Sequence, residues 1–442
     1  MVRLRQLLDG LSHRLLFVPI LAVAVAIGLS QAAILVDGNV ATGDLPQFLQ
    51  TTIPNGRSIL SAISGGLISA ITLLLSLMMV TVQLASSQFS PRTLRNWVGD
   101  RTLQVVVGML LGTTVYCLLI LRQTRSFSDR QAIVPNVSVI LAVVLGILSL
   151  VAMVVAVDHM TNSLRVGSVA TRLRVATVRL VERGDAIGAP TGRDDPGSPA
   201  APATPAPEPP ADALVVESTG TGWLQQVSPD DLREAVPEGG CVWLEHRLGA
   251  FVAARTPLAR VWPAPSDDHA DACRRRIRSA VAIGDARTMQ QDVGFGILQL
   301  VDIAVRGLSP GVNDPNTAKD VIVHLGAVLG ALWERPAPPG WTCEDGRTVV
   351  VPVLDHAGYL HEAFDQIRRY GSGDVEVVLT LVRTLGDLRS ETIRRGLPGP
   401  LGPIDEAIRE ILGAARAGDP AVSDLRLVNE AVERVRPDEV PA

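Results

Sequence analysis

Long apolar stretches fill the first third of the chain. Four of them contain no Asp, Glu, Lys, Arg or His: Leu15–Val36, Ser58–Ala85, Leu103–Leu121 and Ile133–Val157. A helix of about 20 apolar residues is long enough to cross a hydrocarbon core of about 30 Å. The pattern therefore predicts a four-span transmembrane domain in residues 1–160, embedded in a lipid bilayer.

The arginines beside these spans predict the orientation. The segments expected on the same side of the membrane as the N-terminus, residues 3–14, 92–101 and 165–179, carry ten arginines. The two loops on the other side carry four. Because basic residues are retained on the cytoplasmic side, we expect both termini in the cytoplasm and the spans in a bacterial inner membrane. The loop 122–132 argues against this orientation, since it carries three of the four arginines assigned to the outside.

Two segments of different character follow the last span. Residues 161–185 place Arg165, Arg172 and Arg179 seven residues apart, which predicts a juxtamembrane amphipathic helix. This helix either lies on the cytoplasmic membrane surface, with arginines near anionic headgroups, or continues span four as a solvated helix. Residues 186–212 are rich in proline and alanine and predict a disordered linker.

The rest of the chain changes from strand-like to helical patterns. Short Val-, Leu- and Trp-rich segments between Gly and Pro predict a small β unit over 213–263. Helical periodicity over 264–442 predicts a mainly helical domain with helices at 267–283, 288–307, 315–333, 356–370, 374–388, 403–416 and 420–434, and a short strand at 347–354. The expected fold class is therefore a membrane α-helical domain followed by an α+β cytoplasmic region.

Span two carries a stripe of small and polar residues. They recur at three-, four- and seven-residue steps and so share one helix face: Ser58, Ser61, Gly65, Ser69, Thr72, Ser76 and Gln83. Such a face lets helices approach closely and form hydrogen bonds across the contact. The alternative is that the stripe lines a polar path in a homo-oligomer. The absence of charged residues from the spans argues against a proton relay but not against a passive pore.

A second polar group lies in the C-terminal region. The predicted helix 288–307 places Asp292, Gln299, Asp302 and Arg306 on one face, and the loop after it contributes Ser309, Asn313, Asp314 and the only lysine, Lys319. Asp314 before Pro315 is a typical helix N-cap, so structure alone explains part of the loop. The functional hypothesis is that face and loop form one pocket or inter-subunit contact.

Composition narrows the chemistry. A net charge of −5 predicts no nucleic-acid partner. The four cysteines show no metal-type spacing, which favours free thiols in a reducing compartment. No triad, nucleotide loop or carboxylate pair stands out, so we expect no catalytic residue, metal or cofactor.

Three segments carry a resemblance to a known family. VTVQLASSQFSPRTL (Val80–Leu94), QDVGFGILQLVDIAVR (Gln291–Arg306) and LSPGVNDPNTA (Leu308–Ala318) resemble a widespread bacterial family of predicted membrane proteins of unknown function. The resemblance extends over nearly the whole chain, including AFDQIRRYG (Ala363–Gly371). It implies a multi-span N-terminal region and a cytoplasmic C-terminal region, and it brings no activity.

These observations leave three functional hypotheses. The leading one is a regulatory or scaffold protein whose cytoplasmic region binds a ligand or protein partner. The second is a homo-oligomeric channel lined by the span-two stripe. The third, a membrane-associated enzyme, would need a deep pocket with perturbed acids near Asp292 and Asp302.

The predicted orientation can be tested with reporter fusions. Alkaline phosphatase fused after Ala442 should be inactive, whereas the same enzyme inserted within 37–57 should be active, because it folds only outside the cytoplasm. Strong activity from the C-terminal fusion would overturn the orientation.

Overall fold

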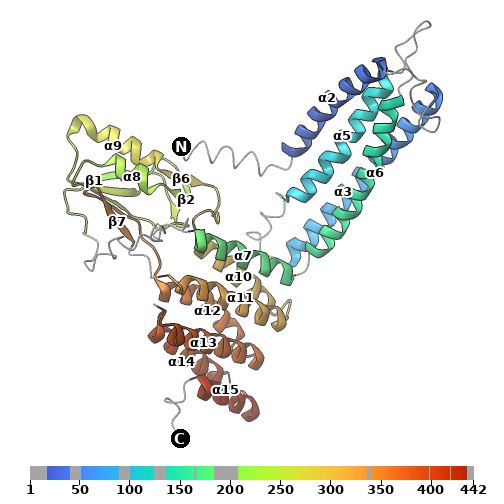
Figure 1. Cartoon of the computed structure of the whole chain (residues 1–442). Helices are drawn as coiled ribbons and strands as arrows, with labels where there is room; N and C mark the ends of the chain where they lie inside the picture. Colours follow the sequence, from blue (N-terminus) through green and yellow to red (C-terminus); the bar gives the residue numbers. More distant parts are fainter. Residues whose placement is uncertain are drawn as a thin grey trace. The chain divides into compact units, whose positions relative to one another are not determined.

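The computed structural model describes residues 17–39, 51–88, 100–123, 136–163, 166–183, 208–335, 340–397, 399–418 and 420–435. The chain divides into two compact units, one within residues 7–165 and one from Val166 onward (Figure 1). Most of the predicted linker, 186–212, lies outside the described residues.

Four long helices form the first unit: α2 (Phe17–Asn39), α3 (Ile53–Gln88), α5 (Arg101–Gln123) and α6 (Asn136–Ser163). Each is long and apolar enough to cross a membrane. The predicted four-span domain is therefore confirmed, as is the α+β character of the region that follows.

Helix α5 is the most buried of the four and contacts the other three. Its sequence GMLLG places Gly108 and Gly112 against α2, where a Cβ on Gly112 would lie 3.1 Å from the Ala22 carbonyl oxygen. Small residues four apart let two membrane helices approach at backbone distance. The close-packing motif of this bundle is thus on span three, although the sequence analysis assigned that role to span two.

The stripe on α3 faces away from the other three spans. All seven stripe residues are exposed within the unit, and no atom of another described helix lies within 4 Å of a Cβ placed on Gly65. Helix α3 packs instead through Leu60, Leu67 and Leu74, which are almost fully buried. Close packing of the stripe within one subunit is therefore wrong, because the larger apolar side chains occupy the helix contacts.

The stripe hydroxyls are hydrogen-bonded along their own helix. Ser69 Oγ donates to the Gly65 carbonyl oxygen at 3.2 Å, Thr72 Oγ1 to Ile68 at 3.0 Å and Ser76 Oγ to Thr72 at 2.8 Å. An outward-facing hydroxyl therefore does not need a partner helix to satisfy its proton.

Two small sheets begin the second unit. One has the order β1-β5-β3-β8-β7 and the other β4-β2-β6. The strands are β1 (Leu214–Glu217), β2 (Gly222–Val227), β3 (Cys241–Leu244), β4 (Phe251–Val252), β5 (Pro257–Trp262), β6 (Val281–Gly284), β7 (Trp341–Glu344) and β8 (Arg347–Val350). Helices α8 (Pro229–Ala235) and α9 (Asp267–Ser279) pack against them.

The β structure extends beyond the predicted 213–263. Strand β8 pairs in parallel with β3 about a hundred residues earlier, and the β7–β8 hairpin turns at Asp345–Gly346, both with positive φ. Asp-Gly is a strong two-residue hairpin signal that the sequence analysis missed. Helix α9 also ends at Ser279 rather than at 283, because Val281–Gly284 pairs with β2 instead.

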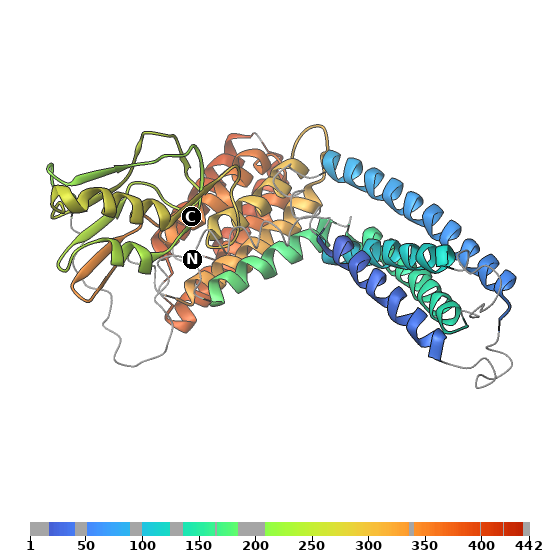
Figure 2. The same ribbon diagram turned by 90° about the horizontal axis from the view of Figure 1, so that it is seen from above.

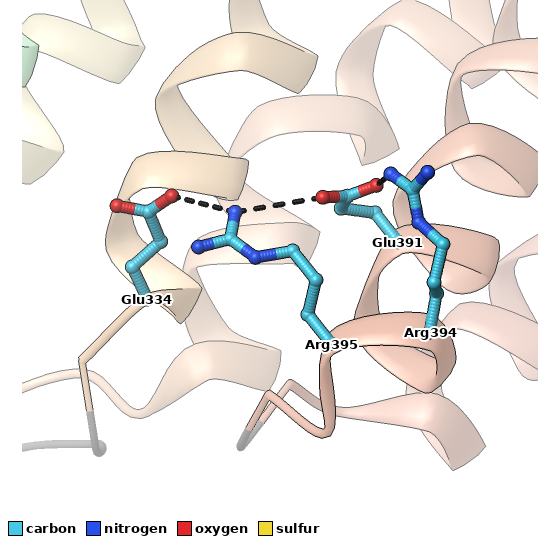
Figure 3. Close-up of polar contacts among 4 residues, drawn as sticks. All are labelled: Glu334, Glu391, Arg394 and Arg395. Atoms are coloured by element: carbon cyan, nitrogen blue, oxygen red, sulfur yellow. Dashed lines mark hydrogen bonds and ion pairs between the residues drawn. The ribbon is translucent and has the colours of Figure 1, made fainter.

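The helical part contains α7 (Val166–Arg183), α10 (Val293–Gly307), α11 (Pro315–Trp333), α12 (His356–Gly371), α13 (Val375–Arg395), α14 (Leu401–Ala417) and α15 (Val422–Val435). Helices α10 and α11 are adjacent, α12 packs beside α10, and α13 joins α11 to the last two helices. Ion pairs add to this packing at the ends of α11 and α13, where Arg395 Nη1 lies 2.8 Å from Glu334 Oε1 and 3.5 Å from Glu391 Oε1. The other oxygen of Glu391, Oε2, pairs with Arg394 (Figure 3).

Helix α7 is part of this helical core (Figures 1 and 2). Its buried side, formed by Val169, Leu173, Thr177 and Leu180, packs against α10 and α11. The predicted amphipathic helix is present, but its apolar side is occupied by protein and is not free to lie on a membrane surface.

The outward direction of the α3 stripe predicts how the protein responds to a larger residue at Gly65. Gly65→Leu should leave the thermal stability of the solubilised subunit unchanged, because a Cβ at this position faces open space among the described residues. Gly112→Leu is the matched control and should lower the melting temperature by pushing α5 away from α2. A melting temperature lowered equally by both variants would show that the stripe packs within the subunit after all.

Candidate functional site

The sequence-predicted polar group is divided between the two ends of α10. Asp292 lies at the start of the helix, whereas Ser309, Asn313 and Asp314 follow its end. Fifteen helical residues at 1.5 Å rise separate the two ends by about 22 Å. The eight residues therefore do not form one pocket, and each end has to be considered by itself.

Helix α10 begins later than predicted. The segment from Thr288 to Gln291 is not helical, and Asp292 is the N-cap, whose Oδ1 accepts a hydrogen bond from Phe295 N at 3.0 Å. Asp292 therefore uses its carboxylate to start the helix and is not part of a polar helix face. Further along α10, Gln299 is fully buried, and Asp302 and Arg306 are half-buried.

A cleft opens beside the start of α10. It is small, with a cavity volume of about 30 Å³, and its lining comes from four segments of the chain: Arg247, Leu248, Gln291, Asp292, Val293, Gly294, Pro352, Val353, Leu354 and Tyr359. The lining mixes apolar side chains with polar groups, so a ligand in this small cleft would meet both kinds of contact.

Two ion pairs border this cleft. Arg287 holds Asp292 Oδ2 through Nη2 at 2.7 Å and Nε at 3.0 Å, and Arg247 Nη2 lies 2.9 Å from Glu362 Oε1. The Arg287 guanidinium also lies over the Phe295 ring at 5.3 Å from its centroid. Each charge has a partner, so the cleft carries no net charge to attract an ion.

Gly249 lies directly on the buried Arg287–Asp292 pair. Its φ of 75° suits glycine, and a Cβ there would collide with Asp292 Oδ2 and the Arg287 guanidinium. The Arg247–Gly249 turn can therefore lie directly on the pair and exclude water from it.

Tyr359 supplies a hydroxyl to the cleft. Burial raises its pKa above the ordinary value, and the carboxylates of Asp292 and Glu362 raise it further. The phenol consequently remains protonated over the physiological pH range and can both donate and accept a hydrogen bond. This chemistry is suited to ligand recognition. Among the described ranges, no group of three His, Cys, Asp or Glu side chains is placed to hold a metal.

The other end of α10 leads into a tight loop. Asp314 caps α11, accepting hydrogen bonds from Thr317 N at 3.2 Å and Thr317 Oγ1 at 2.7 Å, and Ser309 Oγ donates to the Arg306 carbonyl oxygen at 2.7 Å. Asn313 has a φ of 49°, a left-handed conformation that asparagine tolerates better than most residues. Lys319 Nζ lies 3.8 Å from Glu376 Oε2 on α13. The predicted N-cap role of Asp314 is confirmed.

Acidic groups at span ends were missed by the sequence analysis. Asp37 accepts hydrogen bonds from Val137 N and Ser138 N and so caps α6 from the end of α2. Asp100 caps α5 and also lies 2.6 Å from His159 Nε2 near the end of α6. These residues lie just outside the apolar runs, and only the folded bundle brings each to its partner.

Substitutions of the N-cap Asp314 and of the left-handed Asn313 should lower the stability of the protein for different reasons. Asp314→Ala should lower the free energy of unfolding by about 1 kcal/mol. Asn313→Ala should also be destabilising, since alanine is strained at positive φ, by about 1–2 kcal/mol. Asn313→Gly removes the side chain without that strain and should be nearly neutral. Urea unfolding of the full-length protein measures all three, and equal loss in Asn313→Gly and Asn313→Ala would show that the side chain itself matters.

The Asp314 contribution should also depend on pH. The Thr317 hydroxyl, chiefly, holds the pKa of Asp314 below its ordinary value. A lowered folded-state pKa gives stability that is complete above the unfolded value of about 3.9 and is lost as the pH falls through the folded value. The difference between wild type and Asp314→Ala should therefore shrink in strong acid and stay constant above neutral pH.

Comparison with known proteins places the chain in a family. Residues 12–387 match the family described as "Predicted membrane protein (DUF2254)", so α14 and α15 lie beyond the matched part. Uncharacterized proteins of Mycobacterium bovis and of two strains of Mycobacterium tuberculosis are each 33% identical over 396 residues, covering 87% of this chain and 73% of theirs. No solved structure matches. The chain belongs to the DUF2254 family of predicted membrane proteins, as the motifs near Gln291 and Leu308 had indicated.

Proposed function

We propose that this protein is a regulatory membrane protein that binds a small ligand in the cleft beside α10. Binding would shift α7 and, through the chain connection, act on span four. The proposal places both termini in the cytoplasm of a bacterial cell, as the arginine distribution predicts. One observation carries it: in the first turn of α10, Gly294 faces the cleft and Gly296 faces α7.

Two glycines on that turn face opposite neighbours. A Cβ on Gly294, which lines the cleft, would lie 2.9 Å from Glu362 Oε2, whereas a Cβ on Gly296 would collide with the Thr177 side chain of α7. The backbone of α10 therefore touches both neighbours directly. In a close-packed interior a shift of this backbone toward or away from the cleft has to move Thr177 as well.

Helix α7 provides a short route from this contact to the membrane domain. It begins at Val166, and α6 ends at Ser163, so a displaced α7 acts on the end of span four within three residues. Helix α7 also spans the helical core: its Gly167 lies beside Asp320 near the start of α11, and the Glu182 carbonyl oxygen accepts a hydrogen bond from Arg335 past the end of α11.

The cleft chemistry limits the ligand class. Leu248, Val293 and the extended segment Pro352–Leu354 offer apolar contacts, whereas Tyr359 and Arg247 offer oriented hydrogen-bond donors. The charged side chains around the cleft are in ion pairs and leave no net charge. This favours a compact neutral molecule with one or two polar groups over a phosphate or a metal ion.

A substitution that fills the cleft tests the proposal. Val353→Trp should displace the ligand and, by mimicking its bulk, alter hydrogen exchange in both α10 and α7. Val422→Trp, at an exposed valine of α15, is the matched control and should alter neither. The protein should be purified full-length from native membranes, with bound small molecules released by denaturation and identified by mass.

Two results would contradict the proposal. One is that the wild-type protein and Val353→Trp release the same small molecules. The other is a Val353→Trp protein whose exchange changes stop at the cleft and leave α7 as it is in wild type.

A channel is the second candidate, because the α3 stripe is available to other copies of the chain. Its seven residues are exposed, and its hydroxyls keep acceptor lone pairs that could face permeating water or ions. Several copies placed around one axis with α3 innermost would give a weakly polar, uncharged path. In proteoliposomes Gly65→Leu should then abolish solute flux while the subunit stays folded, and unchanged flux would exclude this arrangement.

A further inference from the structure

The end of the helical core opposite the cleft gathers residues from four helices. The end of α12 meets the end of α10, since a Cβ on Gly371 would lie 3.2 Å from Leu308 Cδ1. The Lys319–Glu376 pair joins the start of α11 to the start of α13. We call this group the loop end: the 308–314 loop, the first turn of α11, the last turn of α12 and the first turn of α13.

Chain connectivity ties the loop end to span four. A Cβ on Gly167, in the first turn of α7, would lie 3.5 Å from Asp320 Oδ2 near the start of α11. Ser163, the last residue of α6, is four residues before Gly167, which is at most about 14 Å of extended chain. The chain that leaves span four therefore enters the C-terminal unit at Gly167, beside the loop end.

The surface of the loop end has the composition of a membrane-interface site. Val312 is 49% exposed at the tip of the loop, and Tyr370 is 61% exposed at the end of α12. Exposed Arg369 precedes this tyrosine and has no ion-pair partner among the residues that the structure describes. Tyrosine is favoured at the level of lipid headgroups, and arginine there binds lipid phosphates.

The acidic groups nearby are mostly engaged. Asp314 and Asp374 cap α11 and α13, and Glu376 is paired with Lys319. Asp320 remains about half exposed, with His324 at 4.0 Å as its ion-pair partner. The loop end thus presents an apolar tip, an aromatic ring and one free arginine, with few unpaired carboxylates to repel an anionic membrane.

We propose that the loop end docks on the lipid headgroup layer of the membrane that the spans cross, with Val312 and Tyr370 in the layer and Arg369 on lipid phosphates. The exposed SPGVN segment of the family motif then has a role that its capping residues do not explain. The contact needs no ligand in the cleft and stands independently of the proposed function.

Site-specific quenching tests this docking on the full-length protein in nanodiscs of phosphatidylcholine and phosphatidylglycerol. Cys343 is the exposed cysteine, and Cys117, Cys241 and Cys273 are buried, so a Cys343→Ser background accepts one added label. Val312→Cys and the control Val422→Cys, both at exposed valines, are each labelled with a small fluorophore. Lipids carrying a nitroxide on the headgroup serve as the quencher.

Docking predicts severalfold stronger quenching at position 312 than at position 422. Arg369→Gln should reduce quenching at 312 in nanodiscs that contain phosphatidylglycerol and have little effect in phosphatidylcholine alone. Equal, weak quenching at the two positions would overturn the proposal, as would quenching at 312 that is absent in single-copy nanodiscs and present only when two copies share a disc, since the loop end would then contact a second copy.

Discussion

The close contact between Gly296 of α10 and Thr177 of α7 is the constraint on which the C-terminal unit depends. Only a hydrogen atom fits at Gly296, because a Cβ would collide with the threonine side chain. Thr177 itself is buried and donates its hydroxyl to the Leu173 carbonyl oxygen of its own helix at 2.7 Å, so it cannot easily turn aside. The contact makes α7 a structural member of the helical core, although a proline-rich stretch separates it from the rest of that core in sequence.

Several features of the unit follow from this placement of α7. Its apolar side is filled by α10 and α11, which leaves the arginines on the outer side and removes the membrane-surface role that the sequence allowed. The cleft lies one helical turn from the contact, on the other side of Gly294. Under the proposed function, the effect of a bound ligand would leave the cleft through this single helix pair.

Local features of the fold could be predicted from sequence, and features set by packing could not. Apolar length located all four spans, and the Asp314–Pro315 pair located the start of α11, because both signals are contained within one segment. The direction of the α3 stripe was not predictable in the same way, since small residues suit a helix contact, a lipid surface and a pore alike. The packing glycines, Gly108 and Gly112, did carry a local GxxxG signal that was overlooked.

The cleft shows the same limit more strongly. Its lining joins a turn near Arg247, the start of α10 and the segment after β8, which are brought together by the parallel pairing of β3 with β8. No spacing pattern in the sequence indicates that pairing, so Tyr359 and Arg247 could not be identified as site residues. The sequence analysis instead placed Asp292 on the face of a helix that was expected to begin at Thr288. The helix begins at Val293, so Asp292 is its N-cap and is not on that face.

A double-mutant cycle on the α7–α10 contact tests the account most directly. Gly296→Ala should lower the free energy of unfolding of the C-terminal unit by about 1–3 kcal/mol through overpacking, measured on the full-length protein. Thr177→Ala alone should cost less, and in combination it should recover most of the loss, because it removes both threonine atoms that the new methyl group meets. Strictly additive effects of the two substitutions would show that α7 does not pack on α10, and the proposed link from the cleft to span four would fail with it.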